Sequence, residues 1–307
     1  SRGIIRHGMH AIAVYEGESE PELIDLPRPD PDVGEALVRT LRVGVDGTEL
    51  SEGDVVVPTV RRRPNGDNTY FERGEPDMAP DGQYHERGIV GDHGFMADYF
   101  TSPAEFLITV PPELAELGFL VEPISITEKA VEHANGSLGL ITLAMFEQRF
   151  DRTYCLGRRE RPDPTIDIIE SLDSTYVNSN EIPVPEIPDA HEAPDLIYES
   201  TGYAKHPFES IEALAPNGVL AALGIPGDWA FEIEGGKLHR ELVLHNKAIV
   251  GSVNSHVGHF EAAVDTLASL SDSFLNDLVT GIYELNDYEA AFVDDDRTIK
   301  NAIQFSE

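Results

Sequence analysis

One stretch constrains the fold more than any other. Asn135-Gly136-Ser137-Leu138-Gly139 places two glycines three residues apart at the start of an apolar segment with helical periodicity, and the predicted strand that follows ends at Arg158 and Arg159. In dinucleotide-binding units, such glycines let the backbone approach a pyrophosphate at a helix N-terminus, and the tip of the next strand contacts the ribose. Asp or Glu at that tip is typical of NAD sites, whereas arginines attract a 2′-phosphate. The sequence therefore predicts a nucleotide site that prefers NADP.

The glycine fingerprint is incomplete. Ala134 stands where its first glycine belongs, and residues 122–133 have the pattern of a helix instead of the expected strand. A Gly-x-x-Gly pair before a helix is also found at ordinary helix starts, so alone it is a weak signal. The arginine pair at the tip of the next strand favours the cofactor site.

Predicted helices and strands alternate from Glu122 onward, which is typical of a parallel sheet with helices on both faces. In order they are helix 136–148, strand 153–157, helix 164–172, strand 175–178, strand 196–199, helix 207–214, strand 219–225, strand 247–253 and helix 259–270. Short strands dominate before residue 122, and residues 61–91 are predicted to form a long functional loop or lobe. The predicted class is therefore α/β, with a β-rich first region.

Acidic residues outnumber basic ones by 56 to 22, which gives a net charge of −34. Such a chain repels nucleic acid and anionic lipid, so neither is expected as a partner. The acids are scattered, and 41% of the residues are hydrophobic, which separates this chain from a disordered acidic protein. We interpret the charge as a halophilic surface that molar salt screens.

The single cysteine, Cys155, excludes an internal disulfide, and its place in a predicted buried strand suggests an inert thiol. No apolar run is long enough to span a bilayer, so no membrane association is expected. No signal peptide is recognised, and Met9 resembles a natural start. The expected location is a high-salt cytoplasm.

Several stretches together resemble the zinc-dependent medium-chain dehydrogenases, and closely the haloarchaeal glucose 1-dehydrogenases. The resemblance runs from Met9 to the C-terminus. It is carried by residues 39–48 (RTLRVGVDGT), 77–82 (DMAPDG), 86–91 (ERGIVG), 122–125 (EPIS), 155–159 (CLGRR), 228–231 (DWAF) and 251–256 (GSVNSH).

The resemblance implies a GroES-like β-rich catalytic domain and a doubly wound parallel-sheet (Rossmann) cofactor domain. Expected boundaries are 9–121 for the first part of the catalytic domain, 122–256 for the cofactor domain, and 257–307 for a helix and the return to the catalytic domain. The implied activity is oxidation of D-glucose or a related aldose at C1 to the lactone, with zinc assisting hydride transfer to NADP or, alternatively, NAD. Another aldose or a non-sugar alcohol remains an open alternative. The family also implies a homodimer or homotetramer.

By the resemblance, Asp46 and Glu122 are ligands of a catalytic zinc that keeps one position open for substrate. Without the family, Asp46 reads as a turn residue and Glu122 as a charge at a helix N-terminus. Thr48 matches the family's hydroxyl beside the reacting alcohol. The resemblance thus makes Asp46, Thr48 and Glu122 catalytic, and the sugar-binding set is Thr48, Glu86, Glu122 and Asn254. For Glu86 the plain alternative is a solvated acid on a loop.

Cofactor contacts are expected at three places. Ligands of doubly wound sheets bind at the carboxyl ends of the strands, which points to the ends of the predicted strands 219–225 and 247–253. The predicted contacts are Asn135, Gly136, Ser137 and Leu138 for the pyrophosphate, Arg158 and Arg159 for the 2′-phosphate, and Leu223, Gly224, Ile225, Ser252, Val253 and Asn254 beside the nicotinamide.

The resemblance also exposes two gaps. The family's Gly-His-Glu segment has no counterpart after Thr48, and the strand before Asn135 is missing, about fifty residues in all against the usual two-domain length. Either the gene product is shortened internally or the sequence as given omits these segments. His93 is a minor candidate for the missing histidine ligand. If the gaps are real, the alternative function is a catalytically degenerate dehydrogenase that at most binds NADP.

Overall fold

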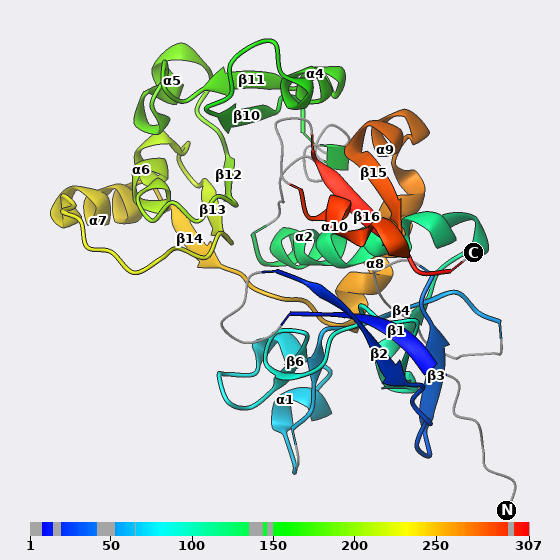
Figure 1. Ribbon diagram of the computed structural model, residues 1–307. Coiled ribbons are helices and arrows are strands. Elements are labelled where there is room, and N and C mark those ends of the chain that lie inside the picture. The colour runs from blue at the N-terminus through cyan, green and yellow to red at the C-terminus, as the bar shows by residue number, and fades with distance from the viewer. Residues whose placement is uncertain are drawn as a thin grey trace, which may run out of the picture. The chain divides into compact units, whose positions relative to one another are not determined.

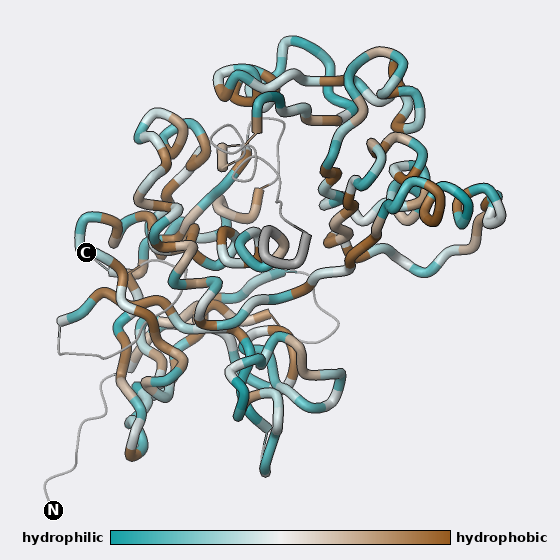
Figure 2. Tube along the Cα trace, turned by 180° about the vertical axis from the view of Figure 1, so that it is seen from behind, coloured by the Kyte–Doolittle hydropathy of each residue, from teal (hydrophilic) through white to brown (hydrophobic). Residues whose placement is uncertain are grey.

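The computed structural model describes residues 8–14, 20–41, 53–64, 66–134, 144–145, 150–293 and 298–306, with the backbone alone for 131–134. The chain divides into two units, one formed by Ser1–Pro123 with Ser255–Glu307 and the other by Ile124–Asn254. Helix α2, Val121–Ala134, begins in the first unit and continues in the second (Figure 1). Polar residues are spread along both units, as Figure 2 shows, which agrees with the scattered acids of the sequence.

The first unit is built from small sheets. Its antiparallel pairs are β1 (Gly8–Ala13) with β2 (Glu22–Pro27), β3 (Glu35–Arg39) with β8 (Tyr99–Pro103), and β4 (Val56–Pro58) with β9 (Leu107–Thr109). β15 (Val279–Glu284) and β16 (Lys300–Gln304) pair in parallel. Its helices include α8 (Val257–Ser269), α9 (Asp272–Leu278) and the 3-10 helix η3 (Pro112–Leu120), with the shorter helices η2 (Ala104–Phe106), η5 (Leu285–Asp287) and α10 (Tyr288–Ala291).

Both ends of the chain contribute to the core of this unit. Met9 and Ala11 of β1 are buried and pack with Ala97, as the alternation of that strand predicts. Ile12, from the same strand, packs with Tyr288 and Ile303 near the C-terminus. Segments far apart in sequence therefore share one apolar cluster.

Of the two forms predicted for residues 61–91, a long loop or a lobe, the structure shows a lobe, which residues 61–64 and 66–92 form. The lobe contains β5 (Arg61–Arg62), β6 (His85–Arg87) and β7 (Gly91–Asp92), with the short helices α1 (Thr69–Glu72) and η1 (Pro76–Met78) between them. Asn68 caps α1 by accepting hydrogen bonds from the backbone N–H groups of Tyr70 and Phe71. The lobe lacks hydrophobic periodicity because polar contacts between distant residues hold it together.

The second unit contains parallel strands and helices in alternation. β10 (Tyr154–Gly157) pairs with β11 (Thr175–Asn178), and β12 (Leu196–Glu199), β13 (Val219–Ala222) and β14 (Ala248–Gly251) form a second sheet. The helices are α4 (Pro164–Ser171), α5 (Ile187–Ala190) after the turn η4 (Val184–Glu186), α6 (His206–Ala213) and α7 (Gly235–Leu244). α4 packs beside β11, and α6 packs against β12, β13 and α7.

The parallel sheet is broken at one position. In a doubly wound sheet with strand order 3-2-1-4-5-6, β11 and β10 take places 3 and 2, and β12, β13 and β14 take places 4, 5 and 6. Among the described residues no strand occupies place 1, and β10 and β12 are not paired. The break falls where the sequence indicates a missing strand. Figure 1 shows β10 and β11 beside α4, apart from β12 to β14.

Most predicted elements of this unit are present, with different ends. β11 and β12 have the predicted bounds, and α4 and α6 agree with prediction within a residue. β13 and β14 end earlier than predicted, at Ala222 and Gly251, so the residues that follow them form loops. Helix α7 was not predicted.

Candidate active site

The predicted nicotinamide contacts lie together at one edge of a sheet. Leu223–Ile225 directly follow β13 and Ser252–Asn254 directly follow β14. The last residues of these two parallel strands, Ala222 and Gly251, are register partners. The two loops therefore leave neighbouring strands at the carboxyl edge, where open parallel sheets bind ligands.

A close backbone approach fixes the first of these loops. A Cβ atom on Gly224 would lie 2.0 Å from the amide nitrogen of Gly202, so only glycine fits there. The backbone N–H groups of Leu223 and Gly224 donate to the carbonyl oxygen of Glu199, the last residue of β12. The loops after β12 and β13 are thus joined at the sheet edge.

The side-chain carboxylate of Glu199 stabilises the same junction between the loops after β12 and β13. It is buried, and its Oε1 accepts from the backbone N–H of Thr201 at 2.8 Å and of Gly202 at 3.1 Å. The hydroxyl of Thr201 also donates to it. A buried carboxylate is expensive unless hydrogen bonds satisfy it, and here they also hold the turn that meets Gly224.

The second loop carries an unsatisfied hydroxyl. The Oγ atom of Ser252 is buried and has no hydrogen-bond partner within the described part of the chain. Buried polar atoms in proteins are almost always paired, so an orphan at a sheet edge suits a ligand that supplies the partner. This is the observation in the described structure that best fits a bound cofactor.

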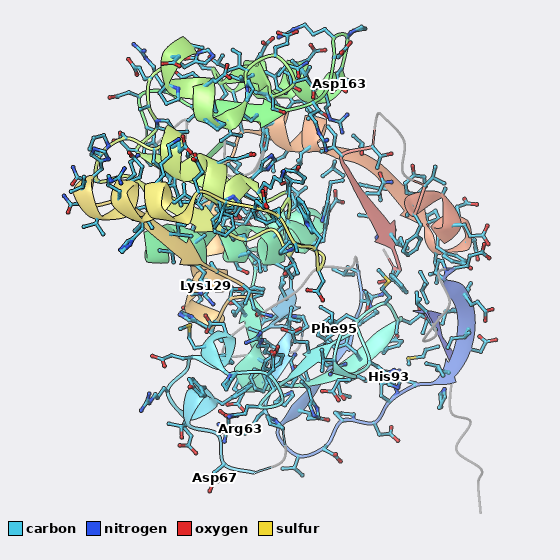
Figure 3. All side chains as sticks on the ribbon, turned by 90° about the vertical axis from the view of Figure 1, so that its left-hand side faces the viewer. Arg63, Asp67, His93, Phe95, Lys129 and Asp163 are labelled. Atoms are coloured by element: carbon cyan, nitrogen blue, oxygen red, sulfur yellow. The ribbon has the colours of Figure 1, made fainter. Side chains whose placement is uncertain are left out.

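A buried lysine holds the backbone of that loop. Lys129 of α2 is 2% exposed, and its Nζ donates to the carbonyl oxygen of Val253 at 2.8 Å. The next residue, Asn254, has a left-handed backbone with φ of 58°. Asn tolerates this conformation better than most residues, so the loop can turn sharply after Val253. The sequence analysis did not identify Lys129 (labelled in Figure 3), although few lysines occur in this chain.

The two predicted 2′-phosphate ligands have different surroundings. Both lie just past β10 and are exposed. Arg159 donates to Asp163 at 2.9 Å, and its carbonyl oxygen accepts from the Tyr176 hydroxyl. Arg158 has no side-chain partner among the residues that the structure describes. Its guanidinium is therefore available to a phosphate.

Asp163 (labelled in Figure 3) links this tip to the next helix. Its Oδ1 caps α4 by accepting from the backbone N–H groups of Thr165 and Ile166. Burial alone would raise the pKa of this carboxyl, but the hydrogen bonds from Arg159 and from these N–H groups outweigh it and lower the pKa. The carboxylate thus stays ionised beside Arg159.

Glu122 lies in the first turn of α2, where the helix dipole favours an anion. Burial nevertheless raises the pKa of its carboxyl, and the positive charge of Lys300 offsets this only in part. A half-buried carboxyl whose charged form is disfavoured in this way gains from a nearby cation. Its chemistry therefore fits a metal ligand.

Glu86 is a buried residue of β6, which excludes the alternative of a solvated acid on a loop. Its Oε1 accepts from Nε of Arg61 at 2.8 Å. Arg61 was not identified from the sequence. Its side chain contacts Glu86 and the backbone of residues 76–79 within the lobe.

Several predicted site residues lie outside the described residues: Asp46, Thr48, Asn135, Gly136, Ser137 and Leu138. Within the described ranges, no group of three or more His, Cys, Asp or Glu side chains could hold a metal ion. His93, which is exposed, is thus in no such group. Glu122 supplies one suitable donor, and a zinc site would need Asp46 and others from the rest of the chain.

Two further predictions can be compared with the structure. Cys155 lies in β10 and is half-buried, and burial raises the pKa of its thiol to about 11, so the thiol stays protonated near neutral pH, in line with the predicted inert cysteine. Among the described helices, none combines the length and the apolar character that crossing a membrane requires.

Comparison with known proteins gives a consistent family. A family model described as "Glucose dehydrogenase C-terminus" matches residues 134–305. The glucose 1-dehydrogenase of Haloferax mediterranei is 56% identical over an alignment of 355 positions, which covers 97% of this chain and 99% of the relative. The chain has 307 residues, so at least 48 of those positions have no residue of this chain. This deficit matches the size of the two gaps.

Solved structures support the fold. The structure of "Haloferax mediterranei glucose dehydrogenase in complex with NADP, Zn and gluconolactone" has a TM-score of 0.93 and 55% identity, covering 97% of this chain and 99% of that one. The 2R,3R-butanediol dehydrogenase of Bacillus subtilis, at 18% identity and a TM-score of 0.76 over 96% of this chain and 99% of that one, shares the fold alone. The predicted fold class is confirmed.

Proposed function

We propose a function from one premise: the chain belongs to the glucose dehydrogenase family. It oxidises D-glucose or a related aldose at C1 to the lactone, and NADP accepts the hydride. The observation that carries this proposal is the 55% identity to a relative whose structure was solved in complex with NADP, zinc and gluconolactone. The orphan hydroxyl of Ser252 and the exposed guanidinium of Arg158 support a bound cofactor in this chain.

In this reaction the C1–H bond breaks and its electron pair passes as hydride to the nicotinamide ring, while the C1 hydroxyl loses its proton as the carbonyl forms. Leu223–Ile225 and Ser252–Asn254 would border the nicotinamide. Arg158 would bind the 2′-phosphate, with Arg159 beside it. Glu86 and Asn254 would accept and donate hydrogen bonds to sugar hydroxyls, which selects against sugars that leave them unpaired.

Asp46 and Glu122 would hold the zinc, which when bound supplies a Lewis acid that favours the ionised C1 hydroxyl. Both are hard oxygen donors, and burial raises the pKa of Glu122 by disfavouring its charged form, which supports a role in which a cation stabilises the carboxylate. Thr48 would lie beside the reacting hydroxyl and pass its proton onward.

The test is NADPH formation by the purified chain in molar salt, with a panel of aldoses and simple alcohols and with NADP and NAD compared. Zinc content is measured on the same sample. Turnover of D-glucose with NADP and stoichiometric zinc supports the proposal. Turnover of an alcohol but of no aldose would instead favour the substrate alternative.

A second candidate function follows from the missing positions. At least 48 alignment positions have no residue here, and the described parallel sheet is broken between β10 and β12. A chain that lacks the central strand and the Gly-His-Glu segment would bind NADP weakly and turn nothing over. Intact mass separates the cases: 33.7 kDa means the shortened chain is the real protein.

We also propose self-association in the cytoplasm of a salt-loving organism. β14 is the last strand of its described sheet, and Ile249 on it is 39% exposed, while Val243 and Leu244 nearby are more exposed still. Exposed apolar side chains at a sheet edge favour pairing with another copy. The net charge of −34 suits high salt. Sedimentation in molar salt would give the oligomer size.

A further inference from the structure

Three consecutive arginines in the lobe have three different surroundings. Arg61 and Arg62 form β5 and are buried, whereas Arg63 is exposed (Figure 3). A buried guanidinium is rare unless its donors are satisfied. The groups that accept hydrogen bonds from each guanidinium therefore indicate the role of that arginine.

Arg61 joins the lobe to the carboxylate of Glu86. Its Nε donates to Glu86 Oε1 at 2.8 Å, and the two residues are also register partners in β5 and β6. Its Nη1 lies within 3.2 Å of three backbone carbonyl oxygens, those of Pro76, Asp77 and Ala79. Its guanidinium lies 3.6 Å from the centre of the Tyr84 ring.

These contacts leave Arg61 little freedom. A guanidinium is planar, and its donors have fixed directions, so the carbonyls of η1 and the ring of Tyr84 define where Nε points. Nε of Arg61 therefore donates its hydrogen bond to Glu86 Oε1 in this fixed direction. The rotamer of Glu86 is thus set by Arg61 and not by solvent, since Glu86 is 9% exposed.

We propose that Arg61 is a positioning residue that holds the Glu86 carboxylate in the orientation needed to bind aldose hydroxyls. This rests on the proposed function, in which Glu86 contacts the sugar. The bond from Arg61 fixes one oxygen of this carboxylate, and in the proposed function the same carboxylate binds the sugar. Arg61 acts through Glu86 and does not touch the reacting atoms.

Arg62, in the same strand, is also buried, but its side chain contacts residues other than Glu86. Its Nη1 donates to the Thr59 hydroxyl at 3.1 Å and its Nη2 to the Ser102 hydroxyl at 3.2 Å. Its guanidinium lies 4.5 Å from the centre of the Phe106 ring. None of these partners is a proposed substrate ligand. Arg62 is therefore the matched buried control, and Arg63 the exposed one.

The test measures KM for D-glucose, KM for NADP, kcat and melting temperature for Arg61→Gln, Arg62→Gln, Arg63→Gln, Glu86→Gln and the double variant Arg61→Gln/Glu86→Gln. We expect Arg61→Gln to raise the glucose KM about tenfold to a hundredfold, the effect of one lost charge-assisted hydrogen bond, with the NADP KM unchanged. Arg62→Gln should lower the melting temperature without this selective change. In the Glu86→Gln background, Arg61→Gln should add little, because both act through one carboxylate.

Arg61→Lys should restore part of the glucose affinity, since an ammonium can pair with Glu86 but cannot reach all the carbonyls of η1. An unchanged glucose KM in Arg61→Gln, or effects that add in full in the double variant, would overturn the inference alone. No NADPH formation by the wild-type chain with any aldose would overturn the proposed function, and the inference with it.

Discussion

The ammonium of Lys129 donates a hydrogen bond of 2.8 Å to the carbonyl oxygen of Val253. This bond ties helix α2 to the loop that follows β14. The loop carries the orphan hydroxyl of Ser252 and the left-handed Asn254. A buried charge that holds a loop backbone indicates that the loop must keep one conformation.

Lys129→Met should loosen this loop. The Val253 carbonyl loses a charged donor, which costs about 1–3 kcal/mol when a buried acceptor is left unsatisfied. We therefore expect a lower melting temperature and a weaker NADP affinity, measured by fluorescence titration. Lys237→Met is the control, because the side chain of Lys237 pairs with Glu212 near the surface and such pairs contribute about 0–1 kcal/mol. Equal NADP affinity in both variants would refute the role of Lys129.

Arg158 should contribute more than Arg159 to the preference for NADP. Arg158 has no side-chain partner within the described ranges, whereas Arg159 is paired with Asp163. Arg158→Ala should lower the ratio of kcat/KM for NADP to that for NAD by about tenfold to a hundredfold, the value of one charged hydrogen bond to phosphate. Arg159→Ala should lower it less, and also destabilise the start of α4.

Arg152→Ala is the matched control for both, because Arg152 lies just before β10 and pairs with the exposed Glu192. Its cofactor ratio should not change. If Arg158→Ala behaves like Arg152→Ala, the assignment of the 2′-phosphate to this arginine is wrong.

The strands of the second unit could be predicted where local pattern decides them. β11 and β12 are short, and turn or breaker residues bound them, so their ends follow from sequence. β13 continues the same apolar pattern past Ala222, yet it ends there, because Leu223 and Gly224 bond to Glu199 and Gly224 packs on Gly202. That contact joins residues far apart in sequence, which no local pattern records.

The residues of the candidate site also divide into those that the sequence indicates and those that depend on contacts between distant residues. Glu86 and Glu122 were identified only through the family resemblance, since each also fits an ordinary role, whereas Asn254 also follows from its place at the end of a predicted strand. Arg61 and Lys129 were not identified from the sequence because their partners are distant in sequence. Arg61 contacts Glu86 and the carbonyls of η1, and Lys129 contacts Val253. Buried charges with distant partners are visible only in the fold.

Stability of the metal-free protein should fall as pH rises, through Glu122. Burial raises the pKa of this carboxyl above its ordinary value of 4.5, despite Lys300, so the folded state keeps a proton that the unfolded state releases. The stabilising effect is complete below 4.5 and is lost as pH rises through the folded-state pKa. Glu122→Gln should remove this component. The measurement is the melting temperature against pH in molar salt with a chelator, for both proteins. Parallel curves would show that Glu122 does not titrate in this way.

Gly224→Ala should damage the sheet edge more than any exposed glycine substitution. Its Cβ would lie 2.0 Å from the Gly202 nitrogen and 2.9 Å from Glu199 Oε2, so the loops after β12 and β13 must separate. Such overpacking costs about 1–3 kcal/mol. Because Gly224 lies between two proposed nicotinamide contacts, NADP affinity should fall together with the melting temperature. Gly227→Ala is the control, since a Cβ there meets nothing within 4 Å and should change stability by about 0.5 kcal/mol or less. If Gly224→Ala lowers the melting temperature but leaves NADP affinity unchanged, this loop supports the sheet without bordering the cofactor.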